Sequence, residues 1–100
     1  MRYEDLRKGL VDAVLAGPAE TPPELRRAAL ERGTVPGPLG AYVSKVAHHA
    51  YRVTDADVAA LRQAGHSDDS LFEITVAAAV GAALHRLDRG LAALRGEELD

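Results

Sequence analysis

The stretch SDDSLFEITVAAAVGAALHRLDRGLAAL, residues 67–94, decides the fold class of this 100-residue chain. Ser67 is suited to cap a helix, and the two aspartates after it favour the positive end of a helix dipole. Beyond them, apolar residues recur at helical spacing in two stripes. The first stripe is Val76, Val80, Leu84, Leu87, Leu91 and Leu94, and the second is Phe72, Thr75, Ala79 and Ala82. Because a helix that is apolar on two sides is buried on two sides, we predict a long core helix that also meets another subunit.

The rest of the chain predicts shorter helices and no strand. Four further segments have apolar residues at helical spacing, with glycine, proline or a capping residue between them. We place these helices at residues 3–16, 22–32, 39–51 and 55–64. The expected fold is therefore an all-α bundle of about five helices. It forms one domain, residues 1–100, and assembles as a homo-oligomer through the long C-terminal helix.

Two of the shorter helices also start with a capping signal. Thr21 stands directly before Pro22, and Glu24, three residues after the threonine, would complete a capping box. Thr54 and Asp57 have the same spacing before the next short helix. We therefore expect both threonine side chains to bind the backbone of the helix that follows them.

Two glycines have predicted backbone roles. Gly33 follows the helix at residues 22–32, where a residue in the left-handed conformation commonly ends a helix. Gly81 lies inside the long helix, where glycine costs stability relative to alanine. We therefore expect Gly81 to permit a close crossing with another helix.

Charge and composition argue against several classes of function. The net charge is −3, from 12 lysines and arginines against 15 aspartates and glutamates, without the basic footprint of nucleic-acid binding. No apolar run approaches the ~18–20 residues that span a bilayer, and the charged start MRYEDLRKGL has no signal-peptide core. With no cysteine, the chain has no disulfide and no thiolate. We expect a cytoplasmic protein that binds no nucleic acid, no membrane and no cofactor.

Candidate site residues gather in HHAYRV, residues 48–53. Adjacent helical residues point about 100° apart, so His48 and His49 are poorly placed to bind one metal ion, and no metal site is predicted. His48 falls on the polar face as a solvated side chain. His49 lies at the border of an apolar stripe, which makes it the better candidate for acid–base catalysis. The alternative for His49 is a buried, hydrogen-bonded core histidine.

Glu73 is the second candidate for acid–base catalysis. It stands three residues before Val76, at the head of an apolar stripe of the long helix. A carboxylate there needs a partner or acquires a raised pKa, and either condition can accompany acid–base chemistry. The alternative is a solvated position near the helix start, where the charge only favours the dipole.

The second half of the chain resembles a known superfamily. ALRQAGHSDDSLFEITVAAAVGAALHRLDRGL, residues 60–91, is similar to the pattern of the carboxymuconolactone decarboxylase and alkylhydroperoxidase D-like superfamily. That pattern is a helix ending in alanine and glycine, a turn of serine and acids, an aliphatic residue, a glutamate and a long alanine-rich helix. The resemblance covers about residues 42–94 and leaves residues 1–40 as a two-helix extension. It implies that family's helical bundle and an oligomeric assembly.

The resemblance also implies what this chain does not do. In redox members of the family, a CxxC pair followed by a histidine precedes the turn, and these positions fall at Ala50, Val53 and Asp57. A peroxidase mechanism of this kind needs a thiolate to attack the peroxide and a second thiol to resolve the product. The chain is thus expected to be a cysteine-less, non-redox member without peroxidase activity.

The decarboxylase branch of the family does not depend on the cysteine pair. In such an enzyme, His49 or Glu73 would act as the base and Arg52 would hold a substrate carboxylate, with Tyr51 as a further ligand-binding residue. No motif of the family delivers these four residues, so they are candidates from their chemistry alone.

Three functions remain open from the sequence. We favour an oligomeric binding or accessory protein without catalysis of its own. The alternatives are a small-molecule enzyme of the decarboxylase or lactone class and a structural protein–protein interaction module. The corresponding partners are a second copy, a small organic acid or another protein. An enzyme predicts a closed cavity with His49 or Glu73 pointing inward, whereas an accessory protein predicts a filled core and an exposed apolar patch.

Overall fold

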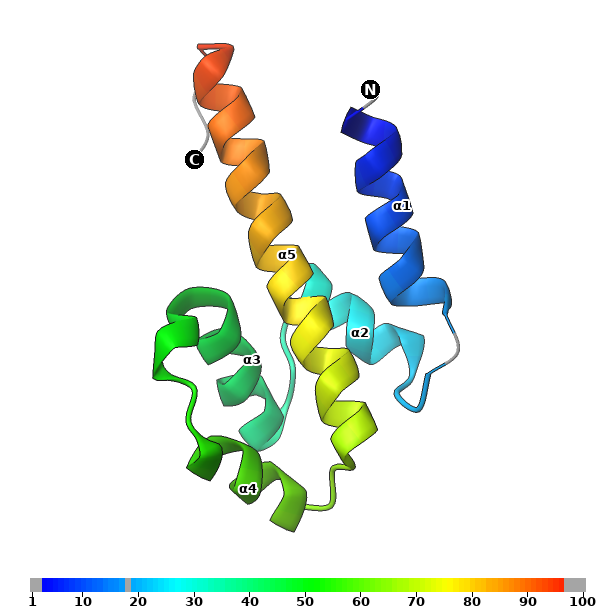
Figure 1. Cartoon of the computed structure of the whole chain (residues 1–100), viewed down its shortest axis with the longest axis vertical. Coiled ribbons are helices and arrows are strands. Elements are labelled where there is room, and N and C mark those ends of the chain that lie inside the picture. The colour runs from blue at the N-terminus through cyan, green and yellow to red at the C-terminus, as the bar shows by residue number, and fades with distance from the viewer. Residues whose placement is uncertain (1–2, 18, 97–100) are drawn as a thin grey trace.

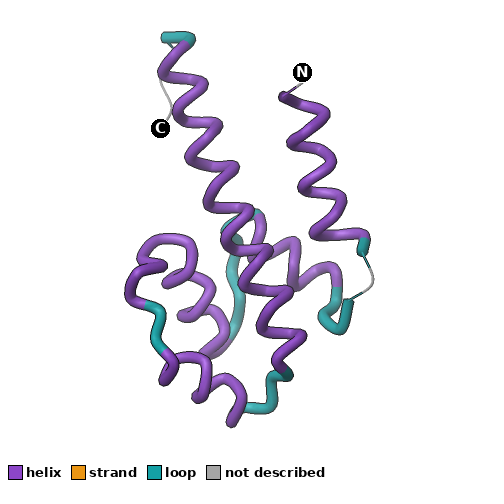
Figure 2. Tube along the Cα trace, in the orientation of Figure 1, coloured by secondary structure: helices purple, strands orange, loops and turns teal. Residues whose placement is uncertain are grey.

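The computed structural model describes residues 3–17 and 19–96, which form helices and loops without a strand (Figures 1 and 2). The elements in chain order are α1 (Tyr3–Ala16), α2 (Pro23–Leu30), α3 (Gly37–His49), the 3₁₀ turn η1 (Ala50–Arg52), α4 (Asp55–Gln63) and α5 (Asp68–Leu94). The predicted all-α class is confirmed, and so are the bounds of α1. The start of α4 at Asp55 and the end of α5 at Leu94 also match the prediction, whereas both ends of α2 and α3 and the end of α4 differ from it by one or two residues.

The long helix α5 is the axis of the molecule. It runs along the longest dimension, with α3 on one side of it, α2 behind it and α1 beside its C-terminal half (Figure 1). The chain measures 46 × 29 × 20 Å, and its radius of gyration is 14.6 Å. A compact chain of this length has a radius of gyration of about 13 Å. The protein is therefore somewhat elongated along α5.

Neither of the two predicted apolar stripes forms the buried side of α5. Its buried residues are Leu71, Ile74, Ala77, Ala78, Gly81, Ala82, Leu84 and Ala92. Only Leu84 and Ala82 belong to the predicted stripes. Because α5 is apolar around most of its circumference, its periodicity indicates a helix without indicating which side faces the core.

The core lies between α5 and α3. Leu39, Tyr42, Val43 and Val46 of α3 are buried there, whereas Ala50, the next apolar residue at that spacing, is exposed. The Tyr42 hydroxyl and Thr75 Oγ1 of α5 lie 2.7 Å apart in a hydrogen bond. The buried tyrosine hydroxyl is therefore satisfied.

Two glycines allow a backbone carbonyl from another segment to lie directly against α5 and α3. A Cβ on Gly81 would collide with the carbonyl oxygen of Leu30 at the end of α2, so the predicted close crossing at Gly81 is confirmed. A Cβ on Gly40 of α3 would likewise collide with the carbonyl oxygen of Val35. Neither obstacle is a flexible side-chain end, so neither glycine has room for a larger residue.

Two of the three predicted caps are confirmed and one is wrong. At the start of α5, Ser67 Oγ accepts from Ser70 N at 3.1 Å. Thr54 Oγ1 accepts from Asp57 N at 3.3 Å, and Asp57 Oδ2 accepts from Thr54 N at 2.9 Å, which completes the capping box of α4. Lys45 also donates to the Asp57 carboxylate. By contrast, α2 has Pro22 at its N-cap and no side-chain cap, because the Thr21 hydroxyl binds Glu73 instead.

The end of α2 also differs from prediction. Arg32, and not Gly33, adopts the left-handed conformation, with a φ of 60°. Arg32 N donates to Ala29 O at 3.4 Å and Gly33 N donates to Ala28 O at 2.8 Å, which is the Schellman pattern of a helix end. The helix therefore stops two residues earlier than expected, with a non-glycine residue in a conformation that glycine favours.

The apolar stripe of α1 is only partly covered by the rest of the chain. No residue of α1 is buried, and Leu6 and Leu10 are 51% and 43% exposed, whereas Val14 is half-buried against the core. Polar contacts also hold this helix to α5, since Tyr3 Oη and Arg7 Nη1 donate to Asp88 Oδ1 at 2.6 and 3.0 Å. The helix α1 therefore rests on the body of the protein through polar contacts near its start and an apolar contact near its end.

Candidate functional site

The sequence-predicted site residues lie in two separate places. His49 ends α3, and Tyr51 and Arg52 belong to η1. The rings of His49 and Tyr51 lie edge to face with centroids 6.1 Å apart, and the Arg52 guanidinium carbon lies 5.5 Å from the Tyr51 centroid. Within the part of the chain that the structure describes, no hydrogen bond, ion pair or ring contact joins Glu73 to these three residues. The structure thus brings three of the four candidates together.

The His49 cluster, formed by His49, Tyr51 and Arg52, lies on the surface. All three of its residues are exposed, and Tyr51 is 78% exposed. The backbone leaves the α-helix at His49, where φ is −144° and ψ is 51°, so a helical wheel misplaces this side chain. Ala47 takes the buried position instead. His49 is therefore not the buried core histidine that the sequence allowed, and it does not face a closed cavity.

Glu73 binds the loop between α1 and α2. Its Oε1 accepts from Thr21 N at 2.9 Å and from Thr21 Oγ1 at 2.6 Å, and its Oε2 accepts from Glu20 N at 2.9 Å. These hydrogen bonds, first that from the Thr21 hydroxyl and then that from the Glu20 backbone, lower the pKa of the Glu73 carboxyl below its ordinary value. Glu73 is therefore a firmly ionised carboxylate that holds a loop to α5.

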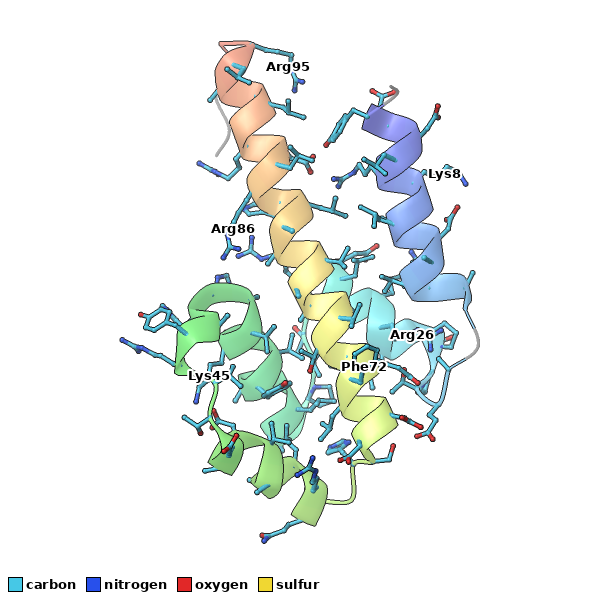
Figure 3. The ribbon with its side chains drawn as sticks, viewed as in Figure 1. Lys8, Arg26, Lys45, Phe72, Arg86 and Arg95 are labelled. Atoms are coloured by element: carbon cyan, nitrogen blue, oxygen red, sulfur yellow. The ribbon has the colours of Figure 1, made fainter. Side chains whose placement is uncertain are left out.

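Arg26 is a buried charge beside Glu73 that the sequence reasoning missed. It is only 3% exposed, and its Nη1 donates to Thr21 O at 2.6 Å and to Thr21 Oγ1 at 3.2 Å. Its Nη2 donates to Leu15 O, near the end of α1, at 2.9 Å. Figure 3 shows the Arg26 side chain on α2. Arg26 lies three and four residues before Ala29 and Leu30, which places it on the buried face of α2. This spacing could have indicated from the sequence that Arg26 is buried.

A small cavity lies next to Arg26 and Glu73. Its volume is about 150 Å³, and it opens between α1, α2 and α5. Ala13 and Val14 line it from α1, and Phe72 and Val76 line it from α5. A cavity of this size can hold a benzene-sized apolar group. The walls are therefore suited to an aliphatic or aromatic side chain more than to a polar ligand.

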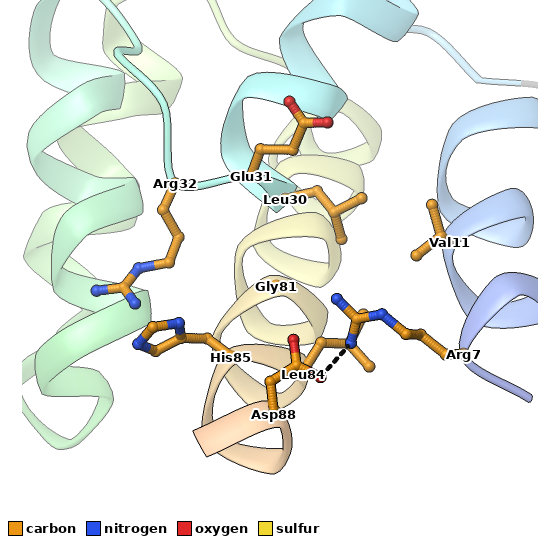
Figure 4. A pocket seen from close by; sticks show the side chains of 9 residues that line it. All are labelled: Arg7, Val11, Leu30, Glu31, Arg32, Gly81, Leu84, His85 and Asp88. Atoms are coloured by element: carbon orange, nitrogen blue, oxygen red, sulfur yellow. Dashed lines mark hydrogen bonds and ion pairs between the residues drawn. The ribbon is translucent and has the colours of Figure 1, made fainter. Parts of the chain in front are cut away.

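A larger groove of about 400 Å³ lies between α1, α2 and α5 (Figure 4). Arg32 and His85 lie on one side of it and Arg7 lies on the other, where it pairs with Asp88 at 3.0 Å. The guanidinium of Arg32 also contacts the exposed His48, with Nη2 3.2 Å from Nε2. The groove combines charges of both signs and is widely open to solvent, so it has no distinct preference for one class of ligand.

The side of α5 opposite the core is apolar and uncovered. We call it the outer seam, and its residues are Phe72, Val76, Ala79, Ala83, Leu87, Gly90 and Leu94. All are exposed except Val76, which is half-buried; Phe72 is 70% and Leu94 84% exposed. In Figure 1, α5 lies in front of α2, so the side away from the core faces the viewer. This arrangement leaves one side of the main core helix without a partner.

The length and composition of α5 would also allow a membrane span. One window of the helix has a mean hydropathy of 1.3, with 39% of it buried in the protein. The core helix of a soluble protein passes the same test. Among the described residues, no three histidine, aspartate or glutamate side chains converge as metal ligands do.

Comparison with known proteins does not add a family to these observations. Searches with family models, against curated proteins and against solved structures find no match for this chain. The features of the chain on which a function could rest are Arg26 with the neighbouring Glu73, the His49 cluster and the outer seam.

Proposed function

We propose that this chain is an oligomeric binding or accessory protein of the carboxymuconolactone decarboxylase-like type, without peroxidase activity. The observation that supports the proposal best is the outer seam. A small domain whose main core helix leaves a continuous apolar side in water gains stability when another surface covers that side. Self-association supplies such a surface without a second kind of molecule.

The chemistry of the candidate residues supports a non-catalytic role. Glu73 accepts three hydrogen bonds from the loop at Glu20 and Thr21, and its lowered pKa makes it a poor proton acceptor at neutral pH. The chain has no cysteine that could attack a peroxide. The proposal therefore assigns Glu73 to the architecture and places function on a surface.

A second candidate function is the binding of a small organic acid at the His49 cluster. The exposed Arg52 guanidinium lies over the Tyr51 ring, and His49 flanks the same ring. A guanidinium held against an aromatic ring can still offer its edge to a carboxylate. Titration with acetate and benzoate, followed by NMR of the three side chains, tests this candidate. Arg52→Gln should abolish any shift, whereas Arg89→Gln, a matched change on α5, should leave it intact.

Light scattering tests the oligomeric proposal directly. We expect the wild-type mass to rise from monomer to oligomer between low micromolar and millimolar concentration. Ala83→Lys places a charge in the middle of the outer seam and should keep the protein monomeric. Ala59→Lys, the same change at an exposed position of α4, should behave as wild type.

Two results would contradict the proposal. A wild-type protein that is folded and monomeric at millimolar concentration would not be self-associating, and would point to the structural module that binds a different protein. Oligomers that persist unchanged in the Ala83→Lys variant would show that the outer seam is not the surface used.

A further inference from the structure

We infer that the outer seam pairs antiparallel with the same seam of a second copy, about a two-fold axis at Ala83. This inference rests on the proposed self-association and specifies its geometry. The first argument is the spacing of the seam. Successive members are separated by 4, 3, 4, 4, 3 and 4 residues, a series that is the same in both chain directions. Two antiparallel copies related by a two-fold axis require that property.

The same spacing keeps the seam straight. Eleven residues of an α-helix complete three turns plus only about 20°, and the outer seam consists of two such repeats that meet at Ala83. The exposed stripe therefore runs nearly parallel to the helix axis from Phe72 to Leu94, and two such stripes can stay in contact along their whole length. A stripe with a strict seven-residue repeat would instead drift around a straight helix.

The side-chain sizes also match in this register. Positions at equal distances from Ala83 oppose each other in the pair, so Val76 faces Gly90 and Ala79 faces Leu87. Each of these pairs combines a larger side chain with a smaller one, as close packing requires. At the axis, Ala83 faces its own copy, and two alanines allow the helix axes to approach to about 8 Å.

At the ends of the seam, Phe72 faces Leu94 of the second copy. Phe72 lies at the edge of the 150 Å³ cavity, which is otherwise lined by apolar residues of α1 and α5 and by the Arg26 and Glu73 pair. Leu94, which is 84% exposed in the single chain, would cover or enter that cavity. The pairing therefore places a highly exposed leucine against a small apolar cavity.

The contact area suits a weak dimer. The seam covers 23 residues of helix, a rise of about 33 Å, and is about 12 Å wide, so two copies bury on the order of 800 Å². The bordering residues Ala13 and Val14 of α1 raise this toward the ~1,000 Å² at which specific interfaces begin. This size favours a concentration-dependent dimer over a permanent one.

A membrane fits the outer seam less well than a second copy does. The helix α5 carries Glu73 and Arg86 within its apolar stretch, and Asp88 lies only two residues beyond Arg86. Charged groups near the middle of a bilayer are costly, whereas in the dimer they lie at the sides of the seam, in contact with their own subunit or with water. Fluid acyl chains adapt to side chains of any size, so contact with a membrane would not require the alternation of small and large residues along the seam.

Disulfide trapping can determine the register, because the natural chain contains no cysteine to interfere. In the antiparallel pair, Ala83→Cys should form a disulfide-linked dimer by itself under mild oxidation. Ala79→Cys and Leu87→Cys should not link to their own copies, but a mixture of the two variants should link to each other. Disulfides require Cα atoms within about 7 Å, so this pattern discriminates between registers. Ala59→Cys, exposed on α4, controls for random collisions.

The outcomes separate the register from the self-association on which it rests. Dimers by light scattering with self-linking of Ala79→Cys and Leu87→Cys would overturn the antiparallel register in favour of a parallel one. Dimers in which Ala83→Cys links no faster than Ala59→Cys would overturn the use of this axis. A monomer at all concentrations would overturn both proposals. Co-sedimentation of the wild type with phosphatidylcholine and phosphatidylglycerol vesicles, in place of dimer formation, would assign the seam to a membrane.

Discussion

The hydroxyl of Thr21 donates a 2.6 Å hydrogen bond to the carboxylate of Glu73, which lies 52 residues later in the chain. The same hydroxyl oxygen accepts from the buried Arg26 at 3.2 Å. One side chain thus connects the start of α2 with both α5 and a buried cation. The backbone of α2 loses its threonine cap in exchange for this long-range contact.

We expect Thr21→Val to destabilise the protein by about 1–2 kcal/mol, because it keeps the shape of the side chain and leaves two polar partners without the hydroxyl. Thr21→Ser keeps the hydroxyl and should lose less. Urea denaturation of the three proteins measures the differences. Equal stabilities for the valine variant and the wild type would mean that water replaces the hydroxyl without loss.

The lowered pKa of Glu73 makes stability depend on pH in a defined direction. The carboxylate contributes fully above its unfolded pKa of 4.5, and this contribution is lost as the pH falls through the lower folded pKa. Glu73→Gln should therefore reduce stability at neutral pH and flatten the loss below pH 4.5. Denaturation curves from neutral pH to pH 3 test this. A variant with the wild-type slope throughout would show that other carboxyls carry the acid sensitivity.

The left-handed conformation of Arg32 offers a stabilising substitution. A side chain with a Cβ costs about 1–2 kcal/mol in this conformation, and the greater unfolded-state freedom of glycine offsets part of the gain. Arg32→Gly should therefore be more stable than Arg32→Ala by about 0.5–1 kcal/mol. Both variants lack the guanidinium that contacts His48, so its loss does not contribute to the difference in stability between them. Thermal unfolding gives the ranking, and a more stable alanine variant would contradict the assigned backbone conformation.

Gly81 should tolerate no side chain. Gly81→Ala brings a methyl group against the Leu30 carbonyl and forces α2 away from α5, at an expected cost of about 3 kcal/mol. Gly9, on the exposed side of α1, is the matched control, because a Cβ added there would have no neighbour within 4 Å. Gly9→Ala should therefore stabilise by about 0.5–1 kcal/mol. Denaturation midpoints that shift in the same direction for both variants would refute the close crossing.

Local signals in the sequence were sufficient for the helices and for two caps, at Ser67 and Thr54. Thr54 and Asp57 lie three residues apart, and the partner of each is the other's backbone, so the sequence contains the whole interaction. Thr21 has an equivalent local pattern, but a carboxylate from a distant part of the chain competes for its hydroxyl. Short-range pattern reasoning cannot detect that competitor.

The side of α5 that faces the core could not be predicted, for a related reason. The exposed Leu87 and the buried Leu84 have the same chemistry and differ only in what the fold places beside them. His49 was expected at the border of the apolar stripe because the α-helix was assumed to continue beyond it. The α-helix ends at that residue, so the expected orientation of its side chain was wrong. Exposure of the candidate site was thus decided by tertiary packing and by a local change of backbone.

The weak burial of α1 has a consequence for how the protein opens. Its attachments include the bonds of Tyr3 and Arg7 to Asp88, that of Arg26 to the Leu15 carbonyl and the packing of the half-buried Val14, whereas α2, α3 and α5 share the main core. Detaching α1 therefore exposes less apolar surface than opening that core and requires less free energy than global unfolding. In native-state hydrogen exchange, the amides of α1 should form a separate, fast-exchanging group with little sensitivity to denaturant. The chain would then behave as two cooperative units of unequal strength within one domain.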